Sequence, residues 1–248
     1  MAVIEQPVEF KTADGIVDGF LYSNDDGKPR HGIIQLQDIM GIRDANRAMA
    51  KRLAEAGYTV LLPNQFYRTG RPPLFDFELK FGDERTMKRF GELTGPITPE
   101  AQERDAKAYV DFLSSQRAVS KGKVGVVGYC FSGSVAVRTA AAQPDKIGAA
   151  ISFHGGGLYS DAPTSPHKLL PKITSQLYFG HAVEDRSMPK EAIEKLEDAL
   201  ASWGGAYESE TYDGALHGWT TPGGPIYNQQ QAERAFNQMN KVFRSALG

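Results

Sequence analysis

Residues 124–133 read Val-Gly-Val-Val-Gly-Tyr-Cys-Phe-Ser-Gly, an apolar run that passes through a glycine-rich turn into small residues. An apolar strand, a tight turn and a helix in this order form a nucleophile elbow, in which the turn lifts the central side chain clear of the backbone. The strained central residue needs small neighbours two positions away on either side, and Gly128 and Ser132 occupy those positions. The stretch therefore predicts that Cys130 is presented as a nucleophile.

Two nucleotide-binding interpretations of this stretch are excluded by its spacing. Cys130 stands where the fingerprint G-x-G-x-x-G needs its middle glycine, and Gly133 is followed by Ser-Val instead of the Lys-Ser/Thr of a phosphate loop. The remaining alternative is that Cys130 is a small buried hydrophobe, as free cysteines often are. The helix N-terminus expected beneath Cys130 favours a thiolate and offers backbone N–H groups to an oxyanion, which supports the catalytic interpretation.

Apolar runs and helical patterns alternate outward from this turn. The predicted strands cover residues 32–36, 58–62, 123–128, 147–153, 175–180 and 207–212, after an opening hairpin at 8–10 and 17–22. The predicted helices cover residues 43–56, 84–93, 99–114, 132–142, 190–203 and 229–247. Because the strand runs are continuously apolar, they indicate an α/β protein with a mostly parallel, doubly wound sheet flanked by helices. The chemistry of such sheets lies at the carboxyl ends of the strands.

The composition is typical of a globular protein. The 248 residues carry a formal net charge of −2, with 41% hydrophobic and 23% charged residues. These values argue against intrinsic disorder and against a nucleic-acid partner bound through bulk charge. We find no repeat or linker and expect a single domain over residues 1–248. Residues 64–97, in which Arg71-Pro72-Pro73 forbids regular structure, are expected to cover the pocket.

Cys130 is the one cysteine of the chain. The sequence therefore excludes an intramolecular disulfide and a multi-thiolate metal site within the chain. The first residues lack the basic segment and long apolar run of a signal peptide, and the longest apolar stretches are too short to span a bilayer. We expect a cytoplasmic protein with a free thiol and no membrane partner.

A thiol is only slightly ionised at neutral pH, so Cys130 needs a base. In a sheet that carries such an elbow, the acid and then the base follow the nucleophile, each after a later strand. Asp185 and His217 follow two of the later predicted strands, and we predict Asp185 as the orienting carboxylate and His217 as the base. Glu184 is the alternative acid, and a half-buried packing role is the alternative for His217.

The other histidines receive no catalytic role. We interpret His181 as a loop residue and His31 and His167 as surface residues. His154 opens the sequence His-Gly-Gly-Gly, which imitates the oxyanion motif of lipases. That motif lies upstream of the elbow, whereas His154 lies downstream, so we interpret residues 154–157 as a glycine-rich strand exit.

The second oxyanion donor is expected in the loop at residues 37–41, after a predicted strand. A backbone N–H of this loop can point at the same site as the N–H of Phe131, and loss of one such donor typically costs about 3 kcal/mol of barrier. Asp38 in this loop is expected close to the thiol. Because a carboxylate there disfavours a thiolate, Asp38 either has a special role or caps the helix that follows.

These residues together resemble the dienelactone hydrolase family of α/β-hydrolases. The resemblance covers most of the chain, and the Gly-Tyr-Cys elbow is fairly specific because most α/β-hydrolases carry serine there. It rests on residues 37–41, 57–63 and 123–133, on the loop that carries Asp185, and on His217.

The resemblance implies the α/β-hydrolase fold and a triad of Cys130, His217 and Asp185 that cleaves esters and lactones. The implied oxyanion donors are the backbone N–H groups of Ile39 and Phe131. We expect a thioester intermediate and no metal or organic cofactor.

The sequence departs from the family pattern at several positions. The family usually has Glu at the position of Asp38, where it holds the resting thiol until substrate displaces it, and the second glycine of the elbow is Ser132 here. Enzymes specific for dienelactone clamp its carboxylate with two arginines. Trp219 and its neighbours stand where one is expected, and Arg85, Lys88 and Arg89 are the candidates for the other. Tyr67 and Trp219 are further candidates for contact with substrate.

The favoured hypothesis is a thiol-dependent hydrolase with a small-molecule lactone or ester as substrate. A catalytically idle protein of the same fold that binds a partner is the alternative, and it predicts no unusual reactivity of Cys130 toward iodoacetamide. A thiol-based redox sensor is disfavoured, because the chain has no resolving cysteine. Both a monomer and a homodimer are compatible with the sequence.

Overall fold

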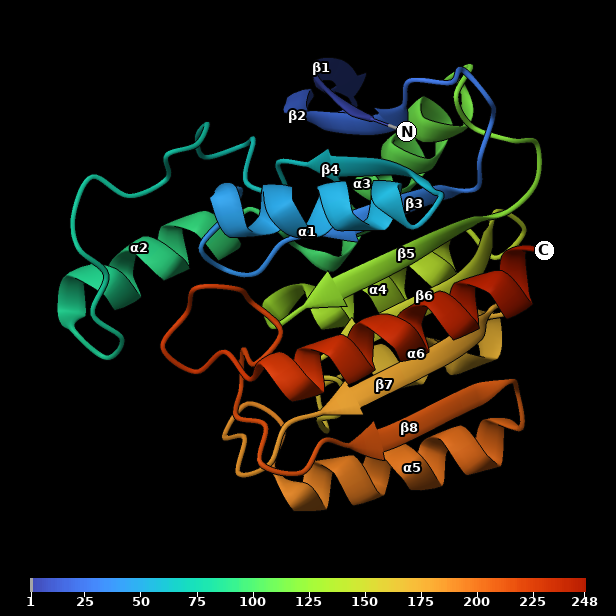
Figure 1. The fold of residues 1–248 in the computed structure, drawn as a ribbon. Helices are drawn as coiled ribbons and strands as arrows, with labels where there is room; N and C mark the ends of the chain where they lie inside the picture. The colour runs from blue at the N-terminus through green and yellow to red at the C-terminus, as the bar shows by residue number, and fades with distance from the viewer. Residues whose placement is uncertain (1) are drawn as a thin grey trace.

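The computed structural model describes residues 2–248 and joins their strands in one eight-stranded sheet of order β1-β2-β4-β3-β5-β6-β7-β8 (Figure 1). β1 and β4 flank β2 in antiparallel pairing, and the strands from β4 to β8 in this order run parallel, which confirms the mostly parallel sheet. The strands are β1 (Val3–Thr12), β2 (Gly15–Asn24), β3 (Gly32–Leu36), β4 (Thr59–Pro63), β5 (Val124–Tyr129), β6 (Ile147–Phe153), β7 (Gln176–His181) and β8 (Tyr207–Thr211).

The winding direction of the sheet reverses between β3 and β5. From β3 the chain continues to β4 on one side, and from β5 it continues through β6, β7 and β8 on the other. The carboxyl ends of the strands at such a switch point form a crevice in which α/β proteins bind their ligands. The topology therefore predicts a ligand site at the loops that follow β3 and β5.

Helices cover both faces of the sheet. α1 and α6 lie on one face, and α3, α4 and α5 lie on the other (Figure 1). Leu53 and Phe243 belong to the apolar layer on the first face, and Leu113 and Leu196 to the layer on the second. The helices are α1 (Asp44–Glu55), α2 (Glu84–Thr94), α3 (Pro99–Ser114), α4 (Phe131–Ala142), α5 (Lys190–Trp203) and α6 (Gln229–Leu247), with a short 3₁₀ helix η1 (Pro166–Lys172).

The opening hairpin is longer than predicted. Its pairing extends from Val3 opposite Asn24 to Thr12 opposite Gly15. β1 is an edge strand whose residues are exposed or only partly buried, so a search for apolar runs finds only residues 8–10 of it. The 3₁₀ helix η1 was not predicted either, because its seven residues include two prolines and have no helical periodicity.

Residues 64–97 contain one helix, α2, and otherwise irregular backbone. α2 begins after Asp83, whose carboxylate accepts a hydrogen bond from the Thr86 backbone N–H at 3.1 Å. A small apolar cluster that includes Phe66 and Leu93 anchors the segment, and Phe131 of the elbow packs against this cluster. α2 projects from the end of the sheet to which the arrowheads of β5, β7 and β8 point (Figure 1). Within residues 2–248 no helix is long and apolar enough to cross a membrane.

Candidate active site

Cys130 lies between the last residue of β5 and the first residue of α4, with φ 58° and ψ −127°. A non-glycine residue at positive φ is strained, which is the backbone signature of the predicted elbow. A Cβ atom on Gly128 would lie 2.0 Å from the carbonyl oxygen of Ser132, so only glycine fits there. The sequence prediction of the turn and of its required glycine agrees with this geometry.

Ser132 has a structural reason to replace the second glycine of the elbow. Its side chain is fully buried, and its Oγ accepts a hydrogen bond from the Tyr129 backbone N–H at 2.9 Å. The same hydroxyl lies 3.0 Å from the carbonyl oxygen of Leu36, to which it can donate. Leu36 ends β3 and precedes the loop at residues 37–41. The serine thus ties the elbow to the loop in which the second oxyanion donor is expected.

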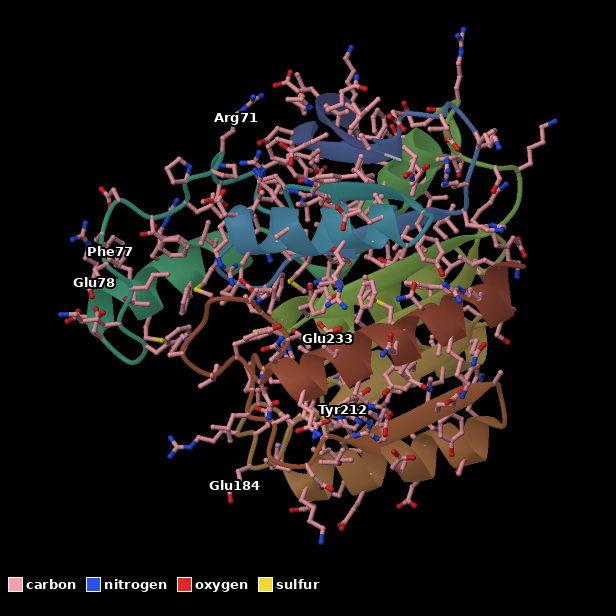
Figure 2. All side chains as sticks on the ribbon, viewed as in Figure 1. Arg71, Phe77, Glu78, Glu184, Tyr212 and Glu233 are labelled. Atoms are coloured by element: carbon pink, nitrogen blue, oxygen red, sulfur yellow. The ribbon has the colours of Figure 1, made fainter. Side chains whose placement is uncertain are left out.

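The structure brings His217 and Asp185 together. His217 Nδ1 donates to Asp185 Oδ2 at 2.6 Å, and the carboxylate is buried. The other oxygen, Oδ1, accepts from the Ser187 backbone N–H at 2.8 Å and from its hydroxyl at 2.6 Å. Burial alone raises the pKa of Asp185, but these hydrogen bonds from His217 and Ser187 outweigh it and lower the pKa. Glu184, the alternative acid, is exposed and extends from the surface (Figure 2).

The pKa of His217 is raised. Burial lowers it, but the hydrogen bond with Asp185 and the interaction with the Cys130 side chain outweigh burial and raise the pKa to about 10. A ring with such a pKa carries a proton at neutral pH. The surroundings of His217 therefore favour its imidazolium form beside Cys130.

Cys130 and His217 line the same cleft of about 280 Å³. One wall is formed by the predicted oxyanion loop, including Ile39 and Met40, and another by residues 221–226 between β8 and α6. Phe81 is the one contribution of residues 64–97 to this lining, and its side chain is mostly exposed. The lining is largely apolar, and its polar side chains are those of Asp38, Arg43, Cys130, His154, His217 and Thr221.

Asp38 is held by Arg43, a residue to which sequence reasoning assigned no role. The two terminal nitrogens of Arg43 donate to the two carboxylate oxygens at 2.7 Å each, and the Met40 backbone N–H donates to Oδ1 at 2.9 Å. Asp38 is nearly buried, and Arg43 is the N-cap residue of α1. The alternative that the Asp38 side chain caps this helix is thus wrong. Its carboxylate is instead neutralised by a bidentate arginine at the wall of the cleft.

The two predicted oxyanion donors lie at the expected places, one in the loop after β3 and one at the start of α4. Ile39 lines the cleft, and Phe131 is the first residue of α4. In residues 2–248 neither backbone N–H has a hydrogen-bond acceptor. Both groups therefore remain able to donate to a bound oxygen atom.

Three residues predicted to contact substrate do not line the cleft. The hydroxyl of Tyr67 donates to Asp105 at 2.8 Å. Arg85 pairs with Asp76 at 3.0 Å and stacks over a phenylalanine of the same segment. Trp219 is fully buried and packs on Tyr212 with ring centroids 5.0 Å apart, because burial of its large apolar surface is more favourable than exposure beside the cleft.

His154 was not identified as part of this site, although it lines the cleft. It follows the last residue of β6, which lies beside β5, and its ring lies 5.1 Å from the ring of His217. The signal in the sequence was a histidine directly after a predicted strand whose neighbour carries the elbow. His181 also differs from its prediction as a loop residue, because it ends β7 and is buried.

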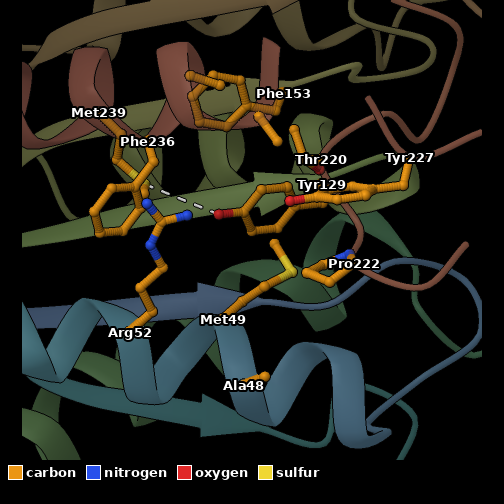
Figure 3. Close-up of a pocket in the computed structure, with 12 residues that line it drawn as sticks. Ala48, Met49, Arg52, Tyr129, Phe153, Thr220, Pro222, Tyr227, Phe236 and Met239 are labelled. Atoms are coloured by element: carbon orange, nitrogen blue, oxygen red, sulfur yellow. Dashed lines mark hydrogen bonds between the residues drawn. The ribbon is translucent and has the colours of Figure 1, made fainter. Parts of the chain in front are cut away.

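Among residues 2–248 no group of three His, Cys, Asp or Glu side chains is arranged to hold a metal ion. A second cavity of about 140 Å³ lies behind the elbow, where Tyr129, Phe153 and Thr220 face side chains of α1 and α6 (Figure 3). This smaller cavity shares Pro222 with the cleft that Cys130 lines.

The strand order, the elbow after β5, and the loops of Asp185 and His217 after β7 and β8 define an α/β-hydrolase fold. Solved structures share it. A dienelactone hydrolase-like promiscuous phosphotriesterase from metagenomic libraries superposes with a TM-score of 0.81 at 20% identity over 100% of both chains. A dienelactone hydrolase from Anabaena variabilis superposes with a TM-score of 0.68 at 18% identity, also over 100% of both chains.

The chain belongs to the dienelactone hydrolase family, whose sequence profile matches residues 17–247. A carboxymethylenebutenolidase from Rhodococcus opacus is 29% identical over 211 residues, which cover 83% of this chain and 78% of that protein. Members of the family are hydrolases of lactones and esters. The family membership confirms the resemblance on which the sequence predictions rested.

Proposed function

We propose that the protein hydrolyses small lactones or esters with Cys130 as nucleophile, His217 as base and Asp185 as the carboxylate that orients it. One observation carries the proposal: His217, which is joined to Asp185 at 2.6 Å, lines the same cleft as a cysteine in the elbow conformation. Nucleophile, base and orienting acid in this relation are the parts that acyl transfer requires.

In the proposed reaction His217 holds the proton of the Cys130 thiol as an imidazolium, and the thiolate attacks the carbonyl carbon. The oxygen that becomes negative is stabilised by the N–H groups of Ile39 and Phe131. Collapse of the tetrahedral intermediate breaks the bond to the alcohol oxygen, which leaves with a proton from His217, and an acyl thioester remains. Water attacks the thioester with the neutral His217 as base, which releases the carboxylic acid and restores the thiolate beside the protonated His217.

We propose that the substrate is uncharged near its reacting carbonyl. In the described chain Arg43 is the one Lys or Arg side chain that lines the cleft, and both of its terminal nitrogens are engaged by Asp38. An anionic substrate would have to displace a bidentate carboxylate to reach Arg43. The apolar wall of Ile39, Met40 and Phe81 favours an uncharged acyl or lactone group.

A matched pair of substrates tests the charge preference. 4-Nitrophenyl butyrate and 4-nitrophenyl hemisuccinate differ mainly in a terminal methyl group against a carboxylate. We expect kcat/KM to be at least about tenfold higher for the butyrate, which corresponds to roughly 1.4 kcal/mol of transition-state binding. A preference for the hemisuccinate would contradict the proposal and would indicate that Asp38 is displaced.

The mechanism is tested by substitution of the nucleophile. We expect Cys130→Ala to abolish turnover with an unchanged melting temperature, and mass spectrometry of the wild type after rapid quenching to find an acyl group on Cys130. Hydrolytic activity that persists in Cys130→Ala would contradict the mechanism. Absence of hydrolysis in the wild type, together with ordinary slow alkylation of Cys130 by iodoacetamide, would favour the idle binding protein.

We further propose a cytoplasmic location and a small molecule as the sole partner that the reaction needs. A nucleophilic thiol must stay reduced, and the cytoplasm keeps thiols in that state. Oxidation of Cys130 to a sulfenic acid on exposure to peroxide, with loss of activity that a thiol reductant restores, is the expected behaviour.

A further inference from the structure

The side chain of His154 joins the nucleophile to the loop that carries the base. Its Nδ1 accepts a hydrogen bond from the Cys130 backbone N–H at 3.0 Å, and its Nε2 lies 2.8 Å from Thr220 Oγ1. Thr220 follows His217 by three residues in the same loop. His154 is fully buried, so neither bond competes freely with water.

The segment that begins with His154 also holds the other backbone group of Cys130. The Gly156 N–H donates to the Cys130 carbonyl at 3.3 Å, and the Cys130 N–H is shared between His154 Nδ1 and the carbonyl of Phe153 at 3.1 Å. The backbone has little room to move here, because a Cβ on Gly133 would lie 2.6 Å from the Gly155 Cα. His154 itself has a positive φ of 40°, a strained conformation that its side-chain bonds help to hold.

These contacts determine the protonation of the His154 ring. Nδ1 accepts from a backbone N–H and therefore carries no proton, so Nε2 carries the proton and donates to Thr220. The side chains that face the ring are His217 at 5.1 Å, Trp219 at 5.0 Å and Tyr129 at 6.1 Å between centroids, with Asp185 acting at longer range. Burial and then the charge of His217 lower the pKa of His154 to about 3, whereas Asp185 opposes the shift.

We propose that His154 is a positioning residue that keeps the Cys130 backbone and the His217 loop in one arrangement, and that it does so as a neutral ring with its proton on Nε2. The proposal rests on the proposed function, since positioning matters only if Cys130 and His217 react together. Its physical basis is that a small displacement of reacting groups costs up to about 100-fold in rate. A histidine that served packing alone would need neither hydrogen bond.

The first test reads the ring directly in the wild-type protein. Long-range ¹H–¹⁵N spectra distinguish the two neutral tautomers of histidine from the imidazolium, and His154→Asn assigns the signal. We expect the Nε2–H tautomer of His154 from about pH 5 to pH 8, while His217 stays protonated over the same range. A proton on Nδ1 of His154, or an imidazolium in this range, would overturn the proposal. The tautomer measurement does not require turnover. Its result therefore tests the role of His154 separately from the proposed function, which Cys130→Ala tests.

The second test separates positioning from packing with two matched pairs of variants. Thr220→Ser keeps the hydroxyl that Thr220→Val removes, and His154→Asn keeps an acceptor near Nδ1 that His154→Leu removes. We expect Thr220→Val and His154→Leu to lower kcat about tenfold or more with KM within about twofold. Thr220→Ser and His154→Asn should stay within about threefold of the wild type. A wild-type kcat in Thr220→Val and His154→Leu would overturn the proposal. Equal losses in all four variants that follow the loss of thermal stability would do the same.

Discussion

Removal of Arg43 should destabilise the protein through the carboxylate that it leaves behind. The Asp38 side chain is 7% exposed, and in an Arg43→Met variant it would keep the Met40 N–H as its sole charge-assisted partner. Breaking a buried ion pair by removal of one partner costs about 3–5 kcal/mol. The Arg43 side chain is 28% exposed, so water reaches the pair and we expect a smaller cost of about 2–3 kcal/mol. For a chain of this size that corresponds to a fall in Tm of about 4–12 °C.

A double-mutant cycle with Asp38→Asn isolates the interaction. Asp38→Asn alone should cost less, because the Arg43 guanidinium keeps Asn46 Oδ1 at 3.0 Å and the Gly41 carbonyl at 3.3 Å. The double variant has no unpaired buried charge, so it should be more stable than Arg43→Met by at least about 1 kcal/mol. Urea unfolding followed by circular dichroism at constant pH measures all four proteins. Additivity within about 0.5 kcal/mol would refute the assigned role of Arg43.

The same cycle reports on catalysis. A carboxylate without its arginine beside Cys130 and Ile39 disfavours negative charge on the sulfur and on the developing oxyanion. We therefore expect kcat/KM to fall in Arg43→Met and to recover when Asp38→Asn is added. Activity that falls equally in the single and double variants would mean that Arg43 acts on the substrate instead of on Asp38.

Three further outcomes follow from distances and pKa shifts at the site. Asp185→Asn should lower kcat by about 10³-fold or more while the fold persists, because it loses the charge that orients His217 and stabilises its protonated form; a loss under tenfold in steady-state kinetics would argue against the triad. The pKa of His217 is raised from 6.5 to about 10, so the stability that its proton contributes is complete below about pH 6.5 and is lost as the pH rises through about 10. The melting temperature of the wild type should therefore decline relative to His217→Asn over that window, and parallel curves would disprove the shift. Gly128→Ala should abolish activity and lower the melting temperature, since its Cβ would lie 2.0 Å from the Ser132 carbonyl oxygen; Gly91→Ala, where no neighbour lies within 4 Å, is the matched control and should behave like the wild type.

Local patterns were sufficient for the elements that carry the site. The predicted helix at 99–114 and strand at 147–153 coincide with α3 and β6, and the other predicted helices and strands after the hairpin agree with the structure within about two residues at each end. The elbow was readable because its requirements are met within ten residues of chain, from the apolar strand to the small residues of α4. That Asp185 and His217 lie together could be predicted as well, since each follows a strand of a sheet whose topology constrains where its loops gather.

The partners of polar side chains could not be predicted in this way. His154 bonds to Thr220 across 66 positions of sequence, and Ser132 to Leu36 across 96. Such contacts depend on which strands become neighbours and on how closely two loops approach, and no periodicity within either segment encodes them. Trp219 illustrates the same limit. Its position close to His217 in the sequence predicted a residue that lines the pocket, whereas packing buries its side chain in the core.

The sequence by itself determined the sheet, the strained turn at Cys130 and the identity of the candidate nucleophile, because backbone sterics and hydrophobic periodicity act over a few residues. Only the tertiary structure decided that Asp38 is neutralised by Arg43 and that His154 joins the elbow to the His217 loop. The physical reason is that the electrostatic environment of a site is the sum of groups brought together by folding, and each of these groups is ambiguous when it is read alone.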